Sequence, residues 1–526
     1  MAKSEYKPLL FTTTVRNPQR LKALLWVFKK FNGLILTDAL ATQIVREVIK
    51  YGLYRPMKIT PEIRQKWATT PKGEFADWIL SDKELNFIMQ NNPQKHKEAG
   101  FSEGFPSRFA TIFDFTKELG LVYYQPNEEI HFSELGLLFA SIYSVTEEGG
   151  MIIAQEEHPE YEQQVFLQSM CKYQRCNPFI RVLNENVPLI LLLQTIQKLN
   201  SDPMFNGAGI ARHELPLLIF WKDGDAEALY RRIKQLRQEY RYNPSDEVII
   251  DICTQEIMGG FKKFKDSSIM SEYPDEFIRK MRLTGLISLR GAGRFIDVNH
   301  NEDEKIKYVL SKYSQYEKYD TEREYFDYMA SIDENLISIQ SATVTETQSE
   351  EMLQRWVNVY SWDCIKKELL NLAERRSSSD DILRFLPNPV RLEFLTALAI
   401  KSCIPESRVI PNYPCDDEGL PTSTAGGNKG DIECLEPQNK CTLVEVTMAE
   451  GRTQTMMEVW PISRHYDDFS NNYVGYNAQC VFIAPTIFSD SISQILWCKD
   501  VKNQVIRPYK IADFIDYLDN SKTLYE

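Results

Sequence analysis

The sequence has few of the residues that build metal-bound or disulfide-bonded small domains. It contains six histidines and ten cysteines in 526 residues, and no two cysteines have the Cys-x-x-Cys spacing. Zinc sites and disulfide frameworks need clustered partners, so neither is expected. The cysteines are predicted to be reduced thiols, mostly buried.

Long apolar runs are also missing. No stretch approaches the roughly 18 consecutive apolar residues that cross a membrane. The start of the sequence lacks the apolar core and small-residue cleavage site of a secretion signal. We therefore expect a soluble, cytoplasmic protein with no membrane partner.

Acidic residues are in excess, with 74 Asp and Glu against 61 Lys and Arg and a formal net charge of −13. Such a chain would ordinarily not bind nucleic acid, because Lys and Arg must replace the counterions of the phosphates. The charge is uneven, however: residues 1–60 carry a net +8 and the rest of the chain −21. A basic segment of this kind indicates either a local polyanion-binding site or a solvated, lysine-rich helix face.

The length predicts several domains, since a single core seldom exceeds about 200 residues. Two stretches, near residues 105–136 and 273–310, show a helix, a β-hairpin and a second helix, an order typical of winged-helix units. Such units often bind DNA, although many bind only proteins. We interpret the chain as multidomain, with a mainly α-helical recognition region of two winged-helix-like subdomains (1–150 and 151–300), a helical linker (301–380) and a C-terminal α/β domain (381–526).

Acidic residues recur at set positions in the last domain. Glu393 stands in an apolar helix, and Asp431 opens a short strand. Glu445 lies near the end of a second, apolar strand, and Glu458 falls in the helix that follows. With a further strand at 479–487, this is the order of the PD-(D/E)xK nuclease core, an α/β domain with a central mixed sheet. Solvated acids on an edge strand would not explain why all four recur in this order.

Asp431 and Glu445 are predicted to bind Mg²⁺. A charge within a strand as apolar as the one that carries Glu445 is costly unless it is paired or metal-bound. Mg²⁺ takes one or two carboxylates together with water and phosphate oxygens. Thr447 stands where the lysine of the nuclease pattern is expected, so the source of that positive charge is open. His465 or Arg464 could replace it, and His465 could equally be a helix histidine bonded to a backbone carbonyl.

The densest motif of the last domain is AGGNKGDIECLEPQNKCTLVEVTMAEGRTQTMMEVWPISRHY at 425–466, which VFIAP follows at 481–485. It resembles the catalytic domain of type IIS restriction endonucleases of the AlwI/BstNBI family, in the PD-(D/E)xK superfamily. Similar short motifs are KPLLFTTTVRNPQR at 7–20 and KYQR at 172–175. By position, the resemblance implies that catalysis involves Glu393, Asp431, Glu445, Glu458 and His465. The AlwI-like group shares the missing lysine, so Thr447 does not by itself indicate an inactive enzyme.

The resemblance implies a bacterial, cytoplasmic enzyme that binds a short asymmetric DNA site, of the GGATC or GAGTC kind, and cuts at a fixed offset. Hydrolysis would need Mg²⁺ and leave 5′-phosphate and 3′-hydroxyl ends. The expected partners are double-stranded DNA, a second copy in a transient dimer through the nuclease domain, and a cognate DNA methyltransferase. Arg, Lys, Asn and Gln read base edges, and the candidates here are Arg16, Asn17, Arg20, Lys172, Gln174 and Arg175.

Two other functions remain open. A nicking endonuclease of the same family would keep this active site but would not pair two catalytic domains, so that it would cut one strand. The alternative outside enzymes is a winged-helix DNA-binding or regulatory protein with an inactive nuclease domain. The presence of Asp431, Glu445 and Glu458 argues against an inactive domain.

Overall fold

The computed structural model describes residues 5–11, 18–68, 70, 72–95, 97, 100–205, 207, 209–261, 264–427 and 429–525. The chain divides into two compact units, residues 1–341 and 342–526. The segments 1–150 and 151–300, predicted as separate subdomains, therefore fall in one unit.

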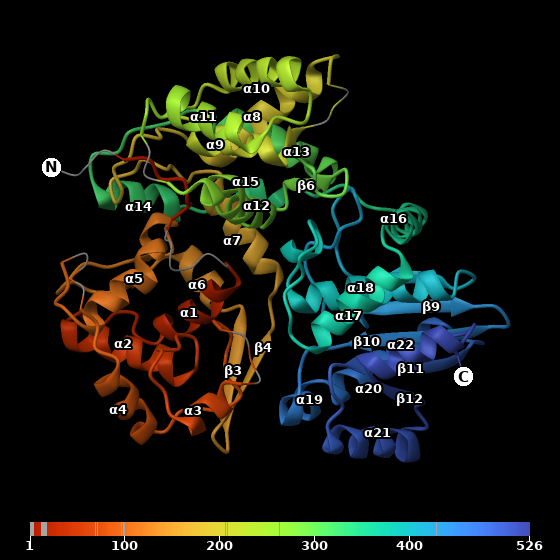
Figure 1. The fold of residues 1–526 in the computed structure, drawn as a ribbon. Coiled ribbons are helices and arrows are strands. Elements are labelled where there is room, and N and C mark those ends of the chain that lie inside the picture. The colour runs from red at the N-terminus through yellow and green to blue at the C-terminus, as the bar shows by residue number, and fades with distance from the viewer. Residues whose placement is uncertain are drawn as a thin grey trace. The chain divides into compact units, whose positions relative to one another are not determined.

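The N-terminal unit is mainly helical (Figure 1). Its helices are α1 (Gln19–Lys29), α2 (Asp38–Lys50), α3 (Pro61–Lys66), α4 (Asp82–Asn91), α5 (Phe105–Glu118), α6 (Glu134–Ala140), α7 (Glu160–Met170), α8 (Pro188–Ser201), α9 (Leu215–Phe220), α10 (Ala226–Tyr240), α11 (Asp246–Asp251), α12 (Tyr273–Arg282), α13 (Asp303–Lys312), α14 (Glu322–Ala330) and α15 (Glu334–Ser338). Its strands are β1 (Val122–Tyr123), β2 (His131–Phe132), β3 (Tyr143–Glu148), β4 (Met151–Glu156), β5 (Ile210–Ala211), β6 (Ile287–Arg290) and β7 (Phe295–Val298).

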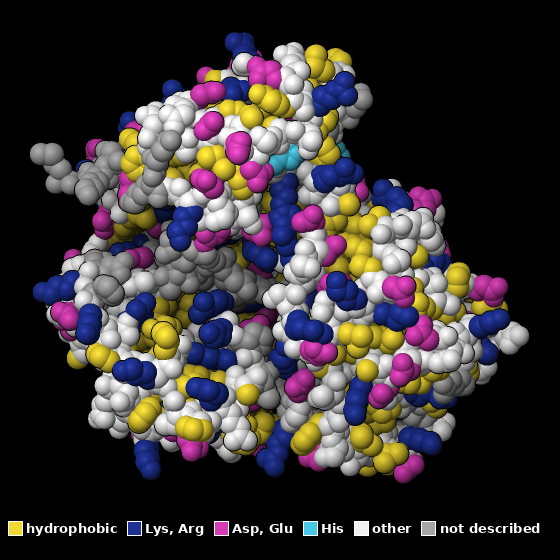
Figure 2. All heavy atoms as spheres, in the orientation of Figure 1, with side chains coloured by type: hydrophobic (Ala, Val, Ile, Leu, Met, Phe, Trp, Pro, Cys, Tyr) yellow, Lys and Arg dark blue, Asp and Glu magenta, His cyan; other side chains and the backbone are white. Residues whose placement is uncertain are grey.

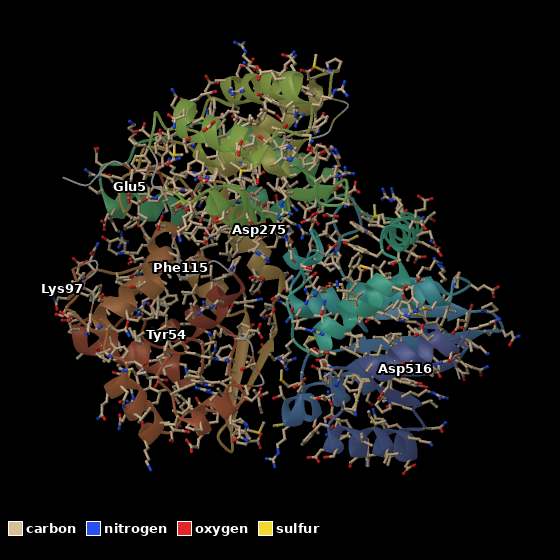
Figure 3. The ribbon with its side chains drawn as sticks, in the orientation of Figure 1. Glu5, Tyr54, Lys97, Phe115, Asp275 and Asp516 are labelled. Atoms are coloured by element: carbon tan, nitrogen blue, oxygen red, sulfur yellow. The ribbon has the colours of Figure 1, made fainter. Side chains whose placement is uncertain are left out.

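The helix–hairpin–helix order predicted from sequence is present at both places. In the first, α5 ends before Gly120, whose φ of +72° suits glycine, and the antiparallel pair β1–β2 leads into α6. Phe115, labelled in Figure 3, is among the buried side chains of α5. In the second, α12 is followed by β6–β7, to which β5 adds a third strand. The hairpins match the expected order of elements, and their use as DNA-contacting wings remains a prediction.

Residues 8–11 are buried in the N-terminal unit, and residues 5–7, which lead to them, are half-buried. The backbone N–H of Leu10 donates to the carboxylate of Glu276 (3.2 Å), and Nζ of Lys280 donates to the carbonyl of Leu10 (2.9 Å). Both partners belong to α12, and Lys280 and Glu276 also form a buried ion pair. An extended segment that is buried must have its backbone groups satisfied, and here α12 does so from more than 260 residues away.

The C-terminal unit is an α/β domain. Its helices are α16 (Glu346–Val359), α17 (Trp362–Ala373), α18 (Asn388–Cys403), α19 (Gly451–Met457), α20 (Val459–Asn472), α21 (Ser489–Lys502) and α22 (Ile511–Asn520), and its strands are β8 (Arg408–Pro411), β9 (Ile432–Glu436), β10 (Lys440–Val446), β11 (Asn477–Ala484) and β12 (Ile506–Lys510). The strands form one sheet in the order β12-β11-β10-β9-β8. Pairing is parallel between β10, β11 and β12 and antiparallel between β8, β9 and β10, which confirms the predicted mixed sheet.

Helices cover both faces of this sheet (Figure 1). Val444 of β10 packs in a core with α17, α18 and α22, whereas Leu443 packs on the other side with α20 and α21. The alternation follows from the two-residue period of a strand. On α22, Phe514 and Ile515 are buried in the first core, while Asp516, labelled in Figure 3, is exposed.

The predicted linker at 301–380 is divided between the two units, which is a correction. Residues up to 341 belong to the N-terminal unit. Beyond it, α16 and α17 pack on α18 and bury Leu353, Trp356 and Leu369 in the C-terminal core. Apolar helix faces of this kind make α16 and α17 part of the C-terminal unit rather than a connector.

Within the described residues, no helix is both long enough and apolar enough to span a membrane.

Candidate active site

The strand register places Asp431 beside Glu445. Val444 pairs with Ile432 in the antiparallel β9–β10 ladder, so the next residue along β10 lies beside the residue that precedes β9. The backbone N–H of Val446 donates to Oδ2 of Asp431 (2.7 Å), which fixes that carboxylate at the end of both strands. The predicted convergence of the two acids on neighbouring strands is therefore present in the structure.

Glu393 joins the pair from α18. The helix begins next to Pro389, a residue suited to the first turn, and buries almost all of its length, so that Glu393 is only 4% exposed. Its Oε2 accepts a hydrogen bond from the backbone N–H of Ala425 (2.9 Å). Burial, followed by the charge of Glu445, raises the pKa of Glu393 to about 8. The carboxyl group therefore lies close enough to Glu445 to feel its charge.

Glu458 reaches the site from a break between two helices. The sequence predicted one helix across this region, but α19 ends at Met457 and α20 begins at Val459. The reason is Pro461, which has no N–H for the carbonyl of Met457 and whose ring clashes with it. Oε1 of Glu458 accepts a hydrogen bond from the hydroxyl of Thr447 (2.8 Å). Burial raises the pKa of Glu458 to about 7, and the charge of Glu445 adds to the effect.

His465, on α20, binds two acceptors. Its Nδ1 lies 2.8 Å from Oε1 of Glu445 and its Nε2 lies 3.2 Å from the carbonyl of Gly427. While Glu445 is ionised, neither oxygen can donate, so the ring then makes both bonds only when both nitrogens carry a proton. Burial lowers the pKa of His465, but the hydrogen bond to Glu445 and its charge outweigh burial and raise the value. Held in this way the ring orients Glu445 and supplies positive charge, and it has no free lone pair with which to act as a base.

The four carboxyl groups repel one another. Burial raises the pKa of Asp431 well above its usual value, and the charges of Glu393, Glu445 and Glu458 raise it further. Burial also raises the pKa of Glu445, although His465 partly offsets the shift. Without a cation, such a cluster retains protons near neutral pH. A divalent cation would displace them and stabilise the ionised form.

Metal-free stability is expected to depend on these shifts. A carboxyl group whose pKa is higher in the folded state contributes full stability below its unfolded pKa and loses it as the pH rises through the folded value. For Glu458 this window runs from 4.5 to about 7. The variant Glu458→Gln cannot ionise, so its melting temperature in EDTA should exceed that of the unmodified protein by a margin that grows between about pH 5 and pH 8. Thermal melts at several pH values measure the margin, and a constant margin would contradict the shift.

Two carboxylates, those of Asp431 and Glu445, fit Mg²⁺, and they leave its other coordination positions open. Among the described residues, no group of three or more His, Cys, Asp or Glu side chains is arranged to hold a metal by itself. Mg²⁺ does not need one, because water and substrate phosphate oxygens fill most of its positions. Asp431 and Glu445, both near the ends of their strands, supply the two carboxylates that such a site requires.

Comparison with known proteins decides the family. A family model for AlwI restriction endonuclease matches residues 117–361 and 338–516, which together span most of the chain. This chain belongs to the AlwI restriction endonuclease family. As a member, it is a restriction endonuclease, a site-specific deoxyribonuclease. No curated protein matches it.

Solved structures give only distant likenesses. The small subunit of the heterodimeric restriction endonuclease R.BspD6I is 20% identical over 29% of this chain and 76% of its own, with a TM-score of 0.25. Restriction endonuclease FokI is 11% identical over 97% of this chain and 96% of its own, with a TM-score of 0.26. FokI bound to DNA is 9% identical over 99% and 97%, with a TM-score of 0.25.

In this AlwI-family chain, three predicted base-reading residues lie in the interior. Lys172 (1% exposed) donates to the carbonyl of Met329 (2.8 Å), and Arg175 (0% exposed) donates to the carbonyl of Lys7 (2.6 Å). Gln174 is 2% exposed. Side chains as deeply buried as these cannot reach a base edge, so the structure corrects the prediction for all three.

The remaining recognition candidates are not excluded in this way. Arg20 is half-buried and donates to the carbonyl of Leu53 (3.2 Å). Arg16 and Asn17 lie outside the described residues. A DNA contact by any of these three stays a prediction.

Two residues that shape the site were not found from sequence. Asn412 donates through its side chain to the carbonyl of Gly430 (2.8 Å) and through its backbone to the carbonyl of Asp431 (2.9 Å). Gly430 has no room for a side chain, since an added Cβ would lie 2.2 Å from Cδ1 of Leu443 and 2.9 Å from Oε1 of Glu445. The glycine directly before the acid was a signal that could have been used, whereas nothing in the sequence marks Asn412.

Proposed function

We propose that the protein is a type IIS restriction endonuclease. It would recognise a short asymmetric site in double-stranded DNA with its N-terminal unit and hydrolyse phosphodiester bonds at a fixed offset with its C-terminal unit, leaving 5′-phosphate and 3′-hydroxyl ends. The observation that carries the proposal is the convergence of Glu393, Asp431, Glu445 and Glu458 in an AlwI-family chain. An enzyme that binds DNA at one position and cuts it at another needs two separate parts, and the two units of this chain meet that need.

In this proposal Asp431 and Glu445 hold Mg²⁺. When bound, the cation would lower the pKa of a water and neutralise charge on the leaving oxygen. His465 orients Glu445 through its 2.8 Å contact, and the backbone of Val446 orients Asp431. Glu393 and Glu458 add negative charge around the pair, which favours a divalent over a monovalent cation.

The N-terminal unit offers a basic face for DNA. Figure 2 shows Lys and Arg side chains gathered on the visible face of this unit over the N-terminal helices α1–α4. Exposed lysines of the sequence between residues 19 and 91 include Lys29, Lys58, Lys72 and Lys83. Contacts from such side chains to phosphates would position the duplex without reading its sequence, and the hairpins β1–β2 and β6–β7 are the proposed wings.

Cleavage of both strands would need two copies of the chain. Each chain supplies the acidic cluster described above, whereas a duplex has two strands of opposite direction. Large apolar side chains are exposed along α21, namely Ile492, Leu496, Trp497 and Val501. Such a surface supports a transient dimer through the nuclease unit. In a bacterial cytoplasm a cognate methyltransferase would protect the host's own sites.

The test is cleavage of supercoiled plasmid with Mg²⁺, followed by mapping of the ends. Linear product at one offset from a common sequence is expected, with a rate that rises more steeply than the protein concentration if two copies act together. Open circles alone would indicate a nicking endonuclease of the same family. A gel shift without cleavage under any divalent cation would favour the DNA-binding protein with an inactive nuclease domain.

A further inference from the structure

Thr447 occupies the position at which the nuclease pattern expects lysine, two residues after Glu445. Its backbone N–H donates to the carbonyl of Ile483 (3.0 Å), which extends the parallel pairing of β10 with β11 by one residue. Its hydroxyl accepts from the backbone N–H of Ala449 (3.0 Å) and donates to Oε1 of Glu458 (2.8 Å). A hydroxyl has one proton to donate, and Thr447 gives it to a carboxylate of the acidic cluster.

Gln454 fixes the same region from the other side. It is 0% exposed, and its Nε2 donates to the carbonyls of Ala449 (3.0 Å) and Thr486 (2.8 Å). Its Oε1 accepts from the backbone N–H of Phe488 (2.9 Å), and its carbonyl accepts from the backbone N–H of Glu458 (3.1 Å). The buried side-chain amide of Gln454 therefore joins the loop after β10 to the loop after β11, and its backbone carbonyl holds the N–H of Glu458 at the end of α19.

We propose that Thr447 is a positioning residue for the hydrolysis. The Thr447 hydroxyl is held by the backbone N–H of Ala449, whose carbonyl is in turn held by Gln454. This hydroxyl fixes the carboxylate of Glu458, so that the charge of Glu458 acts on Asp431 and Glu445 and on the divalent cation they would hold. Where the lysine-containing pattern has an ammonium group, this chain thus has a hydroxyl that holds the carboxylate of Glu458. This inference deepens the proposed hydrolytic function and rests on it.

The first arm of the test compares two changes at one position. Thr447→Val keeps the branched shape but removes the hydroxyl, and we expect it to lower kcat about 30-fold, the loss of one charge-assisted hydrogen bond, with KM for DNA within about two-fold. Thr447→Ser keeps the hydroxyl and should return kcat to within about three-fold of the unmodified protein. Thr447→Lys introduces the lysine of the pattern but removes the hydroxyl, so its kcat is expected to be as low as that of Thr447→Val.

The second arm measures Mn²⁺ binding without DNA by electron paramagnetic resonance. Thr447→Val should weaken the binding midpoint about ten-fold, because Glu458 is no longer held beside the pair, and Thr447→Ser should not. Thr455→Val is the matched control, because its hydroxyl lies 2.9 Å from that of Ser491 on α21 and bonds this hydroxyl rather than a carboxylate. Both readouts should stay within about two-fold in the control. Thermal melts check that every variant is folded.

Each outcome bears on the proposal. A Thr447→Val variant with unchanged kcat and unchanged Mn²⁺ midpoint overturns it, and so does a Thr447→Ser variant as impaired as Thr447→Val. A Thr447→Lys variant with the kcat of the unmodified protein would also overturn it, since a positive charge at this position would then serve as well as the hydroxyl. If the unmodified protein binds Mn²⁺ but cleaves no DNA, the proposed function fails, and the Mn²⁺ comparison still decides the role of Thr447. Absence of Mn²⁺ binding by the unmodified protein overturns both.

Discussion

Glutamine in place of Glu445 is expected to lower the rate of DNA cleavage at least about 1,000-fold while DNA binding stays within about two-fold. The change removes one of the two charges that would hold the cation, yet the amide oxygen can still accept from Nδ1 of His465, which lies 2.8 Å from Glu445. The local shape is therefore kept. Initial rates on plasmid with Mg²⁺ measure the loss, and gel shifts with Ca²⁺ measure binding.

Glu450→Gln is the matched control for this change. Glu450 lies five residues further on, is half-buried, and pairs with Arg375 (3.4 Å) rather than with the acidic cluster. A partly exposed ion pair contributes little, so cleavage should stay within about three-fold of the unmodified rate. Near-normal cleavage by Glu445→Gln would place the hydrolytic site elsewhere in the chain.

Alanine in place of Gly430 is expected to lower cleavage about 100-fold and the free energy of unfolding by about 1–3 kcal/mol. The new methyl group would lie 2.2 Å from Cδ1 of Leu443 and 2.9 Å from Oε1 of Glu445. Leu443 is in the core between β10 and α20, so it cannot move freely, and the strain reaches the carboxylates of Asp431 and Glu445 directly. Cleavage rates and urea unfolding curves measure the two effects.

Gly426→Ala provides the control in the same loop. No atom lies within 4 Å of a Cβ built on Gly426, and the residue is exposed. Both the cleavage rate and the unfolding free energy should therefore remain close to those of the unmodified protein. A Gly430→Ala variant that behaves like Gly426→Ala would show that the turn before Asp431 has room to relax.

The sequence predicted most of the catalytic unit because its signals are local. Acids that interrupt apolar strands are costly, so Glu445 stood out, and the order of elements around it predicted the mixed sheet that the structure confirms. The structure also brings Glu393, Asp431, Glu458 and His465 to Glu445, while their catalytic roles stay predictions. The break at Glu458 was missed although Pro461 marks it, because the helical pattern on both sides continues.

Recognition residues were harder to predict because polar residues serve the interior as well as the surface. Lys172 and Arg175 read as DNA-contacting side chains in sequence, yet both bond backbone carbonyls inside the N-terminal unit. Only tertiary structure distinguishes the two uses, since the partners lie 157 residues later for Lys172 and 168 residues earlier for Arg175. The same reason explains the misplaced linker: whether α16 is a connector or a core helix depends on what α18 presents to it.

The burial of residues 8–11 against α12 also determines when the N-terminal unit can finish folding during synthesis. Their partners on α12, Glu276 and Lys280, leave the ribosome last of the group, roughly 15–50 seconds later at ordinary rates of translation. Throughout that interval Leu9, Leu10 and Phe11, all buried in the finished unit, have no completed site to enter. The N-terminal unit is thus expected to complete its core only after α12 has been synthesised.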